Sequence, residues 1–309
     1  MRYVKFNMND IQDKTVDRKT FDKITGGFFP YVQHHGKATN RYALCPLCDN
    51  PVILLGIGYN SDGEIIDVKS GKTRQITPHG RHTKYDVERL ARFDFARYEC
   101  CPNHLPNCNY VRERYSDEKD EHGIRIYNTM RSYFDQVIKI IQDTIGIRIT
   151  NSFARDLCRN YVEDGVDMYR GSSIDNLPWM TIFAMHTVSM FNRAIRKDSI
   201  LIPFLKECDD FWLSEIDDEY YRIECVGYLN LFFNIVNFRS TSRNDIIKEY
   251  LTFTLARREA DKTTFRTIFE QEVQVDSRAF KEIINADPVT LERNEVLLQI
   301  AREEMPELN

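Results

Sequence analysis

The stretch Cys45-Pro46-Leu47-Cys48-Asp49-Asn50-Pro51-Val52 decides how the first third of this chain is interpreted. Two cysteines at Cys-x-x-Cys spacing on a tight turn bring both sulfurs within about 2.3 Å of one zinc ion. An apolar run at residues 52–59, a turn at 60–63 and a second short run at 64–68 predict a hairpin directly after the cysteine pair. Together, the cysteine pair and the hairpin are typical of a zinc ribbon or a treble clef.

A second group of candidate ligands lies further along the chain. Its members are Cys100, Cys101, His104 and Cys108, and a helix over residues 85–97 is expected to lead into them. Cys101 is preferred to Cys100 because Cys101-Pro102 repeats the order of Cys45-Pro46. Zinc takes four ligands, and Cys108, His104 and His82 stay open as the fourth. His82 qualifies because the loop Pro78-His79-Gly80-Arg81-His82 contains glycine and lies between the two cysteine groups.

Composition indicates a folded protein that is large enough for two domains. The chain has 309 residues, of which 42% are hydrophobic and eight are cysteines. No apolar run approaches the ~20 residues of a spanning helix, and the first ten residues lack the apolar block of a signal peptide. We therefore expect a cytoplasmic protein with no membrane partner. Because thiols stay reduced in that compartment, clustered cysteines indicate metal binding, and the isolated Cys158, Cys208 and Cys225 indicate core positions.

Charge divides the chain into two parts. Residues 1–115 hold 18 Lys or Arg and 13 Asp or Glu, a balance of +5, while residues 116–309 have a balance of −10. A basic segment has the sign that suits a phosphate backbone. We therefore expect nucleic acid as a partner of the N-terminal segment, and a protein partner or a second copy of the chain for the acidic one.

Hydrophobic periodicity changes after residue 123. Apolar residues from Ile126 to Ile145 recur at helical spacing, and further helices are expected over 152–163, from Pro178 and over 204–212. Residues 226–238, 250–256 and 264–275 read as an antiparallel meander, followed by a closing helix from Pro288. We predict an α+β protein with a small zinc-ribbon-like or treble-clef-like domain at 1–116. A domain of helices, then the meander and the closing helix, is expected at 124–309.

Several of these motifs resemble a family of uncharacterised bacterial proteins that have a zinc-ribbon-like head and a helical or α+β body. They are Cys45-Pro46-Leu47-Cys48-Asp49-Asn50-Pro51-Val52, the loop ending at His82, Cys101-Pro102, residues 144–149 and Asn176-Leu177-Pro178-Trp179-Met180. The resemblance implies a zinc site of Cys45, Cys48, His82 and Cys101, with Cys108 as the main alternative for the fourth ligand. The extra His104 and Cys108 depart from the family pattern. The resemblance brings no activity with it.

The ligand set favours a structural zinc over a catalytic one. A catalytic zinc keeps an open position for water, whereas this chain offers more candidate ligands than one ion needs. We therefore expect a non-enzymatic nucleic-acid-binding or protein-binding component of a larger assembly. Basic residues near the site in the sequence are the candidates for phosphate contact: Arg81, Lys84 and Arg89.

The alternative is a metal-dependent nuclease of the His-Asn-His kind. Its residues would be His79, His82 and Asn103. The family resemblance places such an activity in phage defence or in a mobile element. The sequence lacks the Asp-His pair that these enzymes usually carry.

Overall fold

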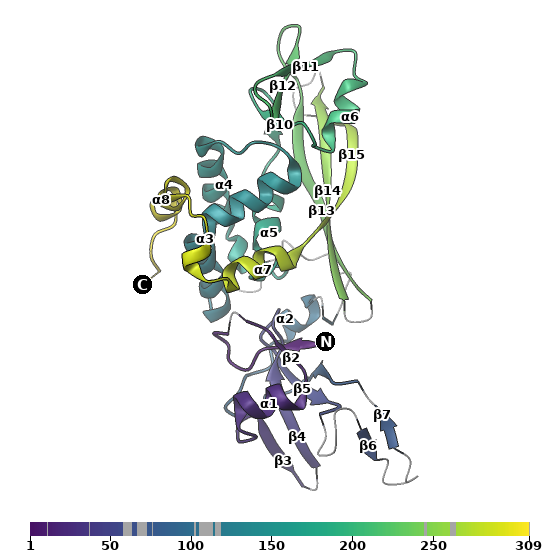
Figure 1. Ribbon diagram of the computed structural model, residues 1–309, viewed down its shortest axis with the longest axis vertical. Coiled ribbons are helices and arrows are strands. Elements are labelled where there is room, and N and C mark those ends of the chain that lie inside the picture. The colour runs from purple at the N-terminus through teal and green to yellow at the C-terminus, as the bar shows by residue number, and fades with distance from the viewer. Residues whose placement is uncertain are drawn as a thin grey trace. The chain divides into compact units, whose positions relative to one another are not determined.

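The computed structural model shows an α+β protein whose contacts divide it into two compact units (Figure 1). The N-terminal unit comprises residues 1–110 and 241–247, and the C-terminal unit comprises 111–240 and 248–309. The structure describes residues 1–10, 12–36, 38–57, 64–66, 73–75, 77–101, 103–104, 114, 119–243, 246–259 and 264–308. The predicted α+β class is confirmed, and the Cys/His cluster of the N-terminal unit is compatible with a small zinc-binding domain.

The N-terminal unit is built on a four-stranded antiparallel sheet. Its strands are β3 (Val32–His35), β4 (Ala38–Leu44), β5 (Pro51–Leu55) and β8 (His79–His82), in the order β3-β4-β5-β8. A small ladder of β1 (Tyr3–Val4) and β2 (Lys14–Thr15) precedes the helix α1 (Arg18–Thr25). Asp17 caps α1 by accepting a hydrogen bond from the Thr20 amide, and Gly26 ends it in the left-handed conformation that glycine tolerates.

The predicted pairing of the strand after the cysteines is wrong. β5 does not form a hairpin with residues 64–66, the part of the expected partner that the structure describes. It pairs with β4 on one side and β8 on the other, so that Val52 lies opposite His82. β6 (Glu64–Ile66) pairs instead with β7 (Thr73–Gln75). The reason is that the Cys-x-x-Cys segment is itself the turn between β4 and β5, which leaves only the other edge of β5 for a further strand.

The predicted helix over residues 85–97 is also wrong in its extent. α2 (Phe95–Cys100) covers only the last part, and it begins after Asp94, whose side chain accepts from the Arg97 amide. Before it, an isolated bridge between Val87 and Ala91 holds the chain in a turn. Cys101 directly follows the C-terminal end of this short helix.

The C-terminal unit has a helical part that is close to the prediction. The helices are α3 (Glu121–Ile145), α4 (Asn151–Asp164), the 3-10 turn η1 (Val166–Met168) and α5 (Leu177–Phe183). Thr150 caps α4, which begins one residue before the expected range of 152–163, and Gly165 ends it. Pro178 lies in the first turn of α5, where its missing amide hydrogen leaves no bond unmade. The apolar face from Ile126 to Ile145 is buried in the core.

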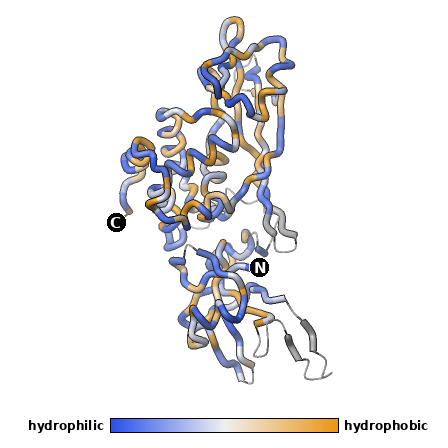
Figure 2. The backbone as a smooth tube through the Cα atoms, in the orientation of Figure 1, coloured by the Kyte–Doolittle hydropathy of each residue, from blue (hydrophilic) through white to orange (hydrophobic). Residues whose placement is uncertain are grey.

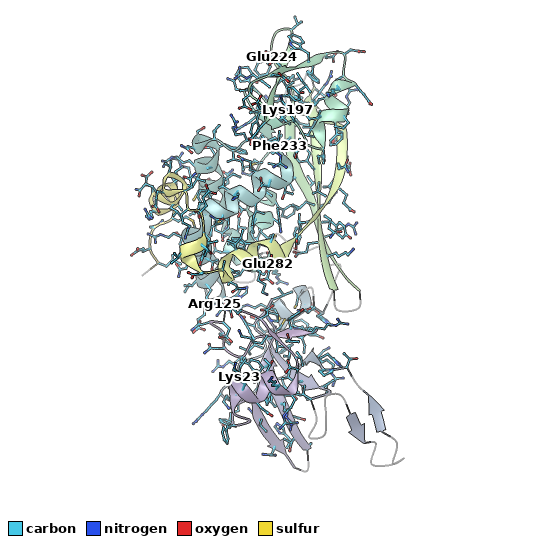
Figure 3. The ribbon with its side chains drawn as sticks, in the orientation of Figure 1. Lys23, Arg125, Lys197, Glu224, Phe233 and Glu282 are labelled. Atoms are coloured by element: carbon cyan, nitrogen blue, oxygen red, sulfur yellow. The ribbon has the colours of Figure 1, made fainter. Side chains whose placement is uncertain are left out.

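Two sheets complete this unit. One has the order β15-β14-β13-β9, and the other has the order β10-β12-β11. Their strands are β9 (Val188–Ser189), β10 (Ala194–Arg196), β11 (Phe211–Glu215), β12 (Tyr220–Cys225), β13 (Phe232–Arg243), β14 (Ile246–Arg258) and β15 (Phe265–Val275). The expected meander corresponds to β13, β14 and β15. Phe233, labelled in Figure 3, is fully buried and stacks on Phe253 with 5.6 Å between ring centroids.

Two helix predictions in this unit need correction. α6 (Leu201–Lys206) ends before Phe211, which starts β11 because it pairs with Cys225 of β12. The closing helix is α8 (Glu295–Glu304), preceded by α7 (Ser277–Asn285) and the 3-10 turn η2 (Pro288–Thr290). Val289 is 91% exposed, so it is not part of the buried face. In the hydropathy view, hydrophobic and hydrophilic residues alternate along the helices that pack on this core (Figure 2).

Candidate metal centre

The turn between β4 and β5 presents the first two cysteines. The Cys45 amide donates to the Asn50 carbonyl at 2.8 Å, and the Asp49 amide donates to the Cys45 carbonyl at 3.1 Å. Asp49 takes a positive φ of 60°, which lets the chain reverse inside the turn. Cys45 is 0% exposed and Cys48 is 4% exposed. The backbone therefore holds both thiols pointing inward at a fixed separation.

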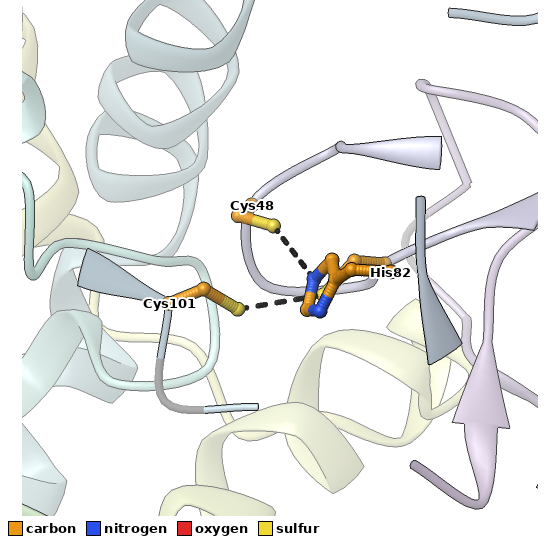
Figure 4. A group of neighbouring side chains, drawn as sticks. Cys48, His82 and Cys101 are labelled. Atoms are coloured by element: carbon orange, nitrogen blue, oxygen red, sulfur yellow. Dashed lines mark hydrogen bonds between the residues drawn. The ribbon is translucent and has the colours of Figure 1, made fainter. Parts of the chain in front are cut away.

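The other two members come from separate elements. His82 is the last residue of β8 and lies beside the turn because of its register with Val52. Cys101 follows α2 in an extended conformation and is 2% exposed. Figure 4 shows the side chains of Cys48, His82 and Cys101 converging on one point. Three non-consecutive segments thus meet in a single cluster.

The spacing of the four side chains fits one tetrahedral ion. Cys45 Sγ lies 3.6 Å from Cys101 Sγ, Cys48 Sγ lies 3.3 Å from His82 Nε2, and all four ligand atoms lie within 4.8 Å of one another. Bonds of about 2.3 Å to sulfur at tetrahedral angles put two sulfurs about 3.8 Å apart. The cluster therefore has the size and the donor set of a Cys3His metal site.

Electrostatics gives a second reason to expect a cation here. Burial raises the pKa of the Cys48 and Cys101 thiols well above the ordinary value. Burial also acts on Cys45, but hydrogen bonds from Cys101 and Cys48, together with the charge of His82, outweigh it and leave the pKa of Cys45 well below the ordinary value. Without a metal, the protein thus favours the thiolate form of Cys45 and the thiol forms of Cys48 and Cys101. A divalent ion would stabilise all three thiolates, because ligand cysteines bind metal in the deprotonated form.

Asn50 links the two halves of the cluster, and the sequence analysis missed it as a functional residue. Its side-chain amide donates to Cys48 Sγ at 3.4 Å and to the Asp94 carbonyl at 3.0 Å, while its Oδ1 accepts from the Asp94 amide at 2.7 Å. Asp94 caps the helix that ends before Cys101. Asn50 is fully buried, so one side chain ties the cysteine turn to the segment that carries the third cysteine. Its place two residues after Cys48 was the only available signal.

A buried ion pair supports the same turn. Lys5 Nζ contacts Asp49 Oδ1, and both side chains are less than a tenth exposed. Lys5 reaches this place because it forms an isolated bridge with Leu44 at the end of β4. The pair anchors the N-terminal segment to the turn of the metal cluster.

The alternatives for the fourth ligand are placed differently. Among the described residues, the ligand group contains His82 and does not contain His104. The His104 ring instead stacks on Tyr98 at 3.7 Å, and Tyr98 packs its ring edge-on against His82. Burial, and then the charges of His82 and Lys84, lower the pKa of His104. Cys108 lies outside the described residues.

Of the residues of the nuclease alternative, His82 and Asn103 lie at the cysteine cluster, whereas His79 lies apart from them. His79 Nδ1 bonds to the Thr77 carbonyl at 2.8 Å, at the other end of β8 from His82. The Asn103 side chain lies 3.6 Å from Cys45 Sγ, to which its amide donates. Asn103 therefore joins Asn50 as a donor to the sulfurs.

The three candidate cations for phosphate contact are all exposed. Arg81 lies on β8 opposite Ile53, Lys84 lies 5.2 Å from the Tyr98 ring centroid, and Arg89 lies 6.0 Å from that of Phe29. Within the described part of the chain, no ion pair joins any of the three to a carboxylate. Their charges are thus available to solvent and to an anionic ligand.

Comparison with known proteins gave no relative from which to infer a function. No protein-family description, curated protein or solved structure matched the chain. A search of the described helices for one that could span a lipid bilayer found none. The cluster and its surroundings are therefore the features of the molecule that bear on function.

Proposed function

We propose that this chain is a zinc-binding, non-enzymatic protein whose N-terminal unit contacts nucleic acid. The observation that carries the proposal is the closed donor set, together with exposed cations that form no ion pair within the described residues. Three cysteines and one histidine supply all four positions of a tetrahedral ion, which leaves no position for a catalytic water. Bound zinc would neutralise the thiolates and hold β4, β8 and the end of α2 together.

The distribution of charge supports nucleic acid as the ligand. Arg81, Lys84 and Arg89 lie within one short segment and project from the unit that the cluster organises. Arginines of the C-terminal unit lie mostly within ion-pair distance of carboxylates. Examples are Arg155 with Glu304 at 2.6 Å and Arg293 with Asp135 at 2.9 Å. Cations that lack an internal partner gain most from a phosphate backbone, since they lose no ion pair on binding.

Zinc content and salt-dependent binding test this proposal. Elemental analysis of the purified chain is expected to give one zinc per chain, retained under mild chelation. Fluorescence anisotropy with labelled oligonucleotides is expected to show affinity that falls with salt. The triple variant Arg81→Gln, Lys84→Gln, Arg89→Gln should weaken binding and flatten the salt slope by up to about two to three counterions.

A matched control removes the same charge elsewhere. Lys139, Lys206 and Arg222 are exposed in the C-terminal unit, and their replacement by Gln should leave binding unchanged. Equal losses in the two triple variants would contradict a specific basic surface. Absence of binding at low salt would contradict the proposal as a whole, and plasmid cleavage that needs His82 would replace it with the nuclease alternative.

A further inference from the structure

The N-terminal unit exposes large aromatic side chains, and one of them lies next to an exposed cation. Phe28 is 74% exposed, Phe29 is 48% exposed and Tyr85 is 49% exposed. We call these three residues, with Arg81 and Arg89, the aromatic ridge. Exposed aromatic rings lack the stabilisation that burial would give them. A group of them near positive charge is therefore typical of a surface that binds a ligand.

The structure fixes the ring of Tyr85 in place. Its hydroxyl lies 3.3 Å from that of Tyr42, which is fully buried and in turn accepts from the Asn40 side chain at 3.0 Å. The His35 ring also contacts the Tyr42 hydroxyl, at 3.3 Å. The phenol end of Tyr85 is thus anchored, while about half of the side chain faces solvent. An anchored ring loses little conformational entropy when a ligand stacks on it.

One glutamine joins the two ends of the ridge. The Gln33 side-chain amide donates to the Pro30 carbonyl and to the Glu88 carbonyl, each at 3.0 Å. These bonds tie the turn that carries Phe28 and Phe29 to the loop that runs from Tyr85 to Arg89. Arg89 then lies 6.0 Å from the Phe29 ring. The turn before β3 and the loop after β8 are therefore joined, and an aromatic ring of the turn lies beside a cation of the loop.

The length of the ridge suits a short stretch of one nucleic-acid strand. Arg89 lies four positions after Tyr85, so their Cα atoms are at most about 14 Å apart. A stacked strand advances about 3.4 Å per nucleotide, so this distance corresponds to at most about four nucleotides. Asp86 and Glu88 are exposed in the same loop, and Asp86 accepts from the Phe93 amide at 2.8 Å. The exposed cations Arg81, Lys84, Arg89 and Arg92 outnumber these two acids.

From these observations we infer that the aromatic ridge binds single-stranded nucleic acid, with Tyr85 and Phe29 stacking on bases and Arg81 and Arg89 contacting phosphates. The inference rests on the proposed function and narrows its ligand. Base faces are accessible in a single strand and hidden in a duplex, so exposed rings add affinity only for the single strand. Basic side chains, in contrast, serve both forms.

The test separates stacking from charge in the full-length, zinc-loaded protein. Anisotropy titrations would use labelled oligothymidine, oligouridine and duplex DNA of roughly 20 nucleotides, which exceeds a typical single-strand site. Tyr85→Leu and Phe29→Leu are each expected to weaken single-strand binding about tenfold, with duplex binding and the salt slope unchanged. Comparison of oligothymidine with oligouridine shows whether DNA or RNA is preferred.

Matched variants control for structure and for aromatic area. Tyr85→Phe keeps the ring and should bind within about twofold of the wild type, whereas Tyr85→Leu should not. Tyr228 of the C-terminal unit is 69% exposed and stacks on Phe191 at 6.2 Å, so Tyr228→Leu removes a similar exposed ring away from the ridge. It should leave binding unchanged. Phe28→Leu provides a further test at the most exposed position of the ridge if Tyr85→Leu fails to fold.

Each result bears on a different claim. If the basic triple variant loses binding but Tyr85→Leu and Phe29→Leu do not, the ridge inference is wrong and the proposed function stands. If the leucine variants weaken duplex and single-strand binding equally, stacking on bases is wrong. If the wild type binds no oligonucleotide at low salt, both proposals fail.

Discussion

The two units of this protein are stabilised in different ways. Among the described residues, the core of the N-terminal unit has 11 buried hydrophobic members, three of which are the clustered cysteines. The core of the C-terminal unit has 46, and only one of them is a cysteine. A small unit cannot bury enough apolar area to offset its conformational entropy, and metal ligation is a common remedy. We therefore expect the N-terminal unit to depend on a metal ion bound by its cluster, and the C-terminal unit to be stable without one.

Charge follows the same division. In the C-terminal unit, the buried Asp135 accepts from Arg293 Nε at 2.9 Å and from the Asn294 amide at 3.0 Å, which fixes the start of α8. Glu304 of α8 similarly accepts from Arg155 and Arg159 of α4. The N-terminal unit also has ion pairs, such as Lys5 with Asp49 and Arg97 with Asp94. Its Arg81, Lys84 and Arg89 differ, because they are exposed and form no ion pair with the described residues.

Removal of a bound metal should have the largest effect, because it should destabilise one unit and leave the other folded. Structural zinc contributes roughly 10–16 kcal/mol in small zinc-dependent peptides, so chelation should unfold the N-terminal unit while the C-terminal unit stays folded. Hydrogen exchange with and without a strong chelator would measure this, as loss of protection in β4, β5 and β8 with protection kept in α3 and α4. Cys48→Ser should behave like the chelated wild type. Uniform loss of protection in both units would show that they fold as one.

The sequence was most informative where structure is local. Helical periodicity from Ile126 and the cap and stop signals around α4 predicted elements that depend on neighbouring residues. It failed where strands pair across distance, because the apolar run after Cys48 has no local signal that selects β8 over residues 64–68 as its partner. The same limit applies to the site. Cys45 and Cys48 were evident from their spacing, whereas the choice among His82, His104 and Cys108 depended on which strand lies beside the turn.

Asn50→Ala should have the next largest effect, and it acts on the N-terminal unit alone. The substitution removes the donor to Cys48 Sγ and both contacts with the Asp94 backbone. Loss of such a supporting contact typically weakens metal affinity by about 10-fold to 100-fold, or roughly 1.4–2.7 kcal/mol. Competition with a zinc-binding dye would measure the affinity. Asn40→Ala in the same sheet is the control, and equal weakening in both variants would contradict a specific role for Asn50.

The smallest expected effect is the pH dependence of stability that comes from Cys158. It contrasts a buried cysteine of the C-terminal unit with the clustered cysteines of the N-terminal unit. Burial raises the pKa of its thiol to about 12, with Glu304 adding to the rise. A folded-state pKa above the unfolded value of about 8.5 means that stability is complete below that value and falls as pH rises towards 12. The free energy of unfolding of the C-terminal unit should therefore drop by about 1.4 kcal/mol between pH 7.5 and pH 9.5 because of this group. Urea unfolding followed at the two pH values, for the wild type and for Cys158→Ala, isolates the contribution. The variant should lose this part of the pH dependence, and an equal drop in both proteins would show that the thiol is not the cause.

Thiol alkylation extends the comparison, since chelation should expose Cys45, Cys48 and Cys101 while Cys158 stays protected until the C-terminal unit unfolds.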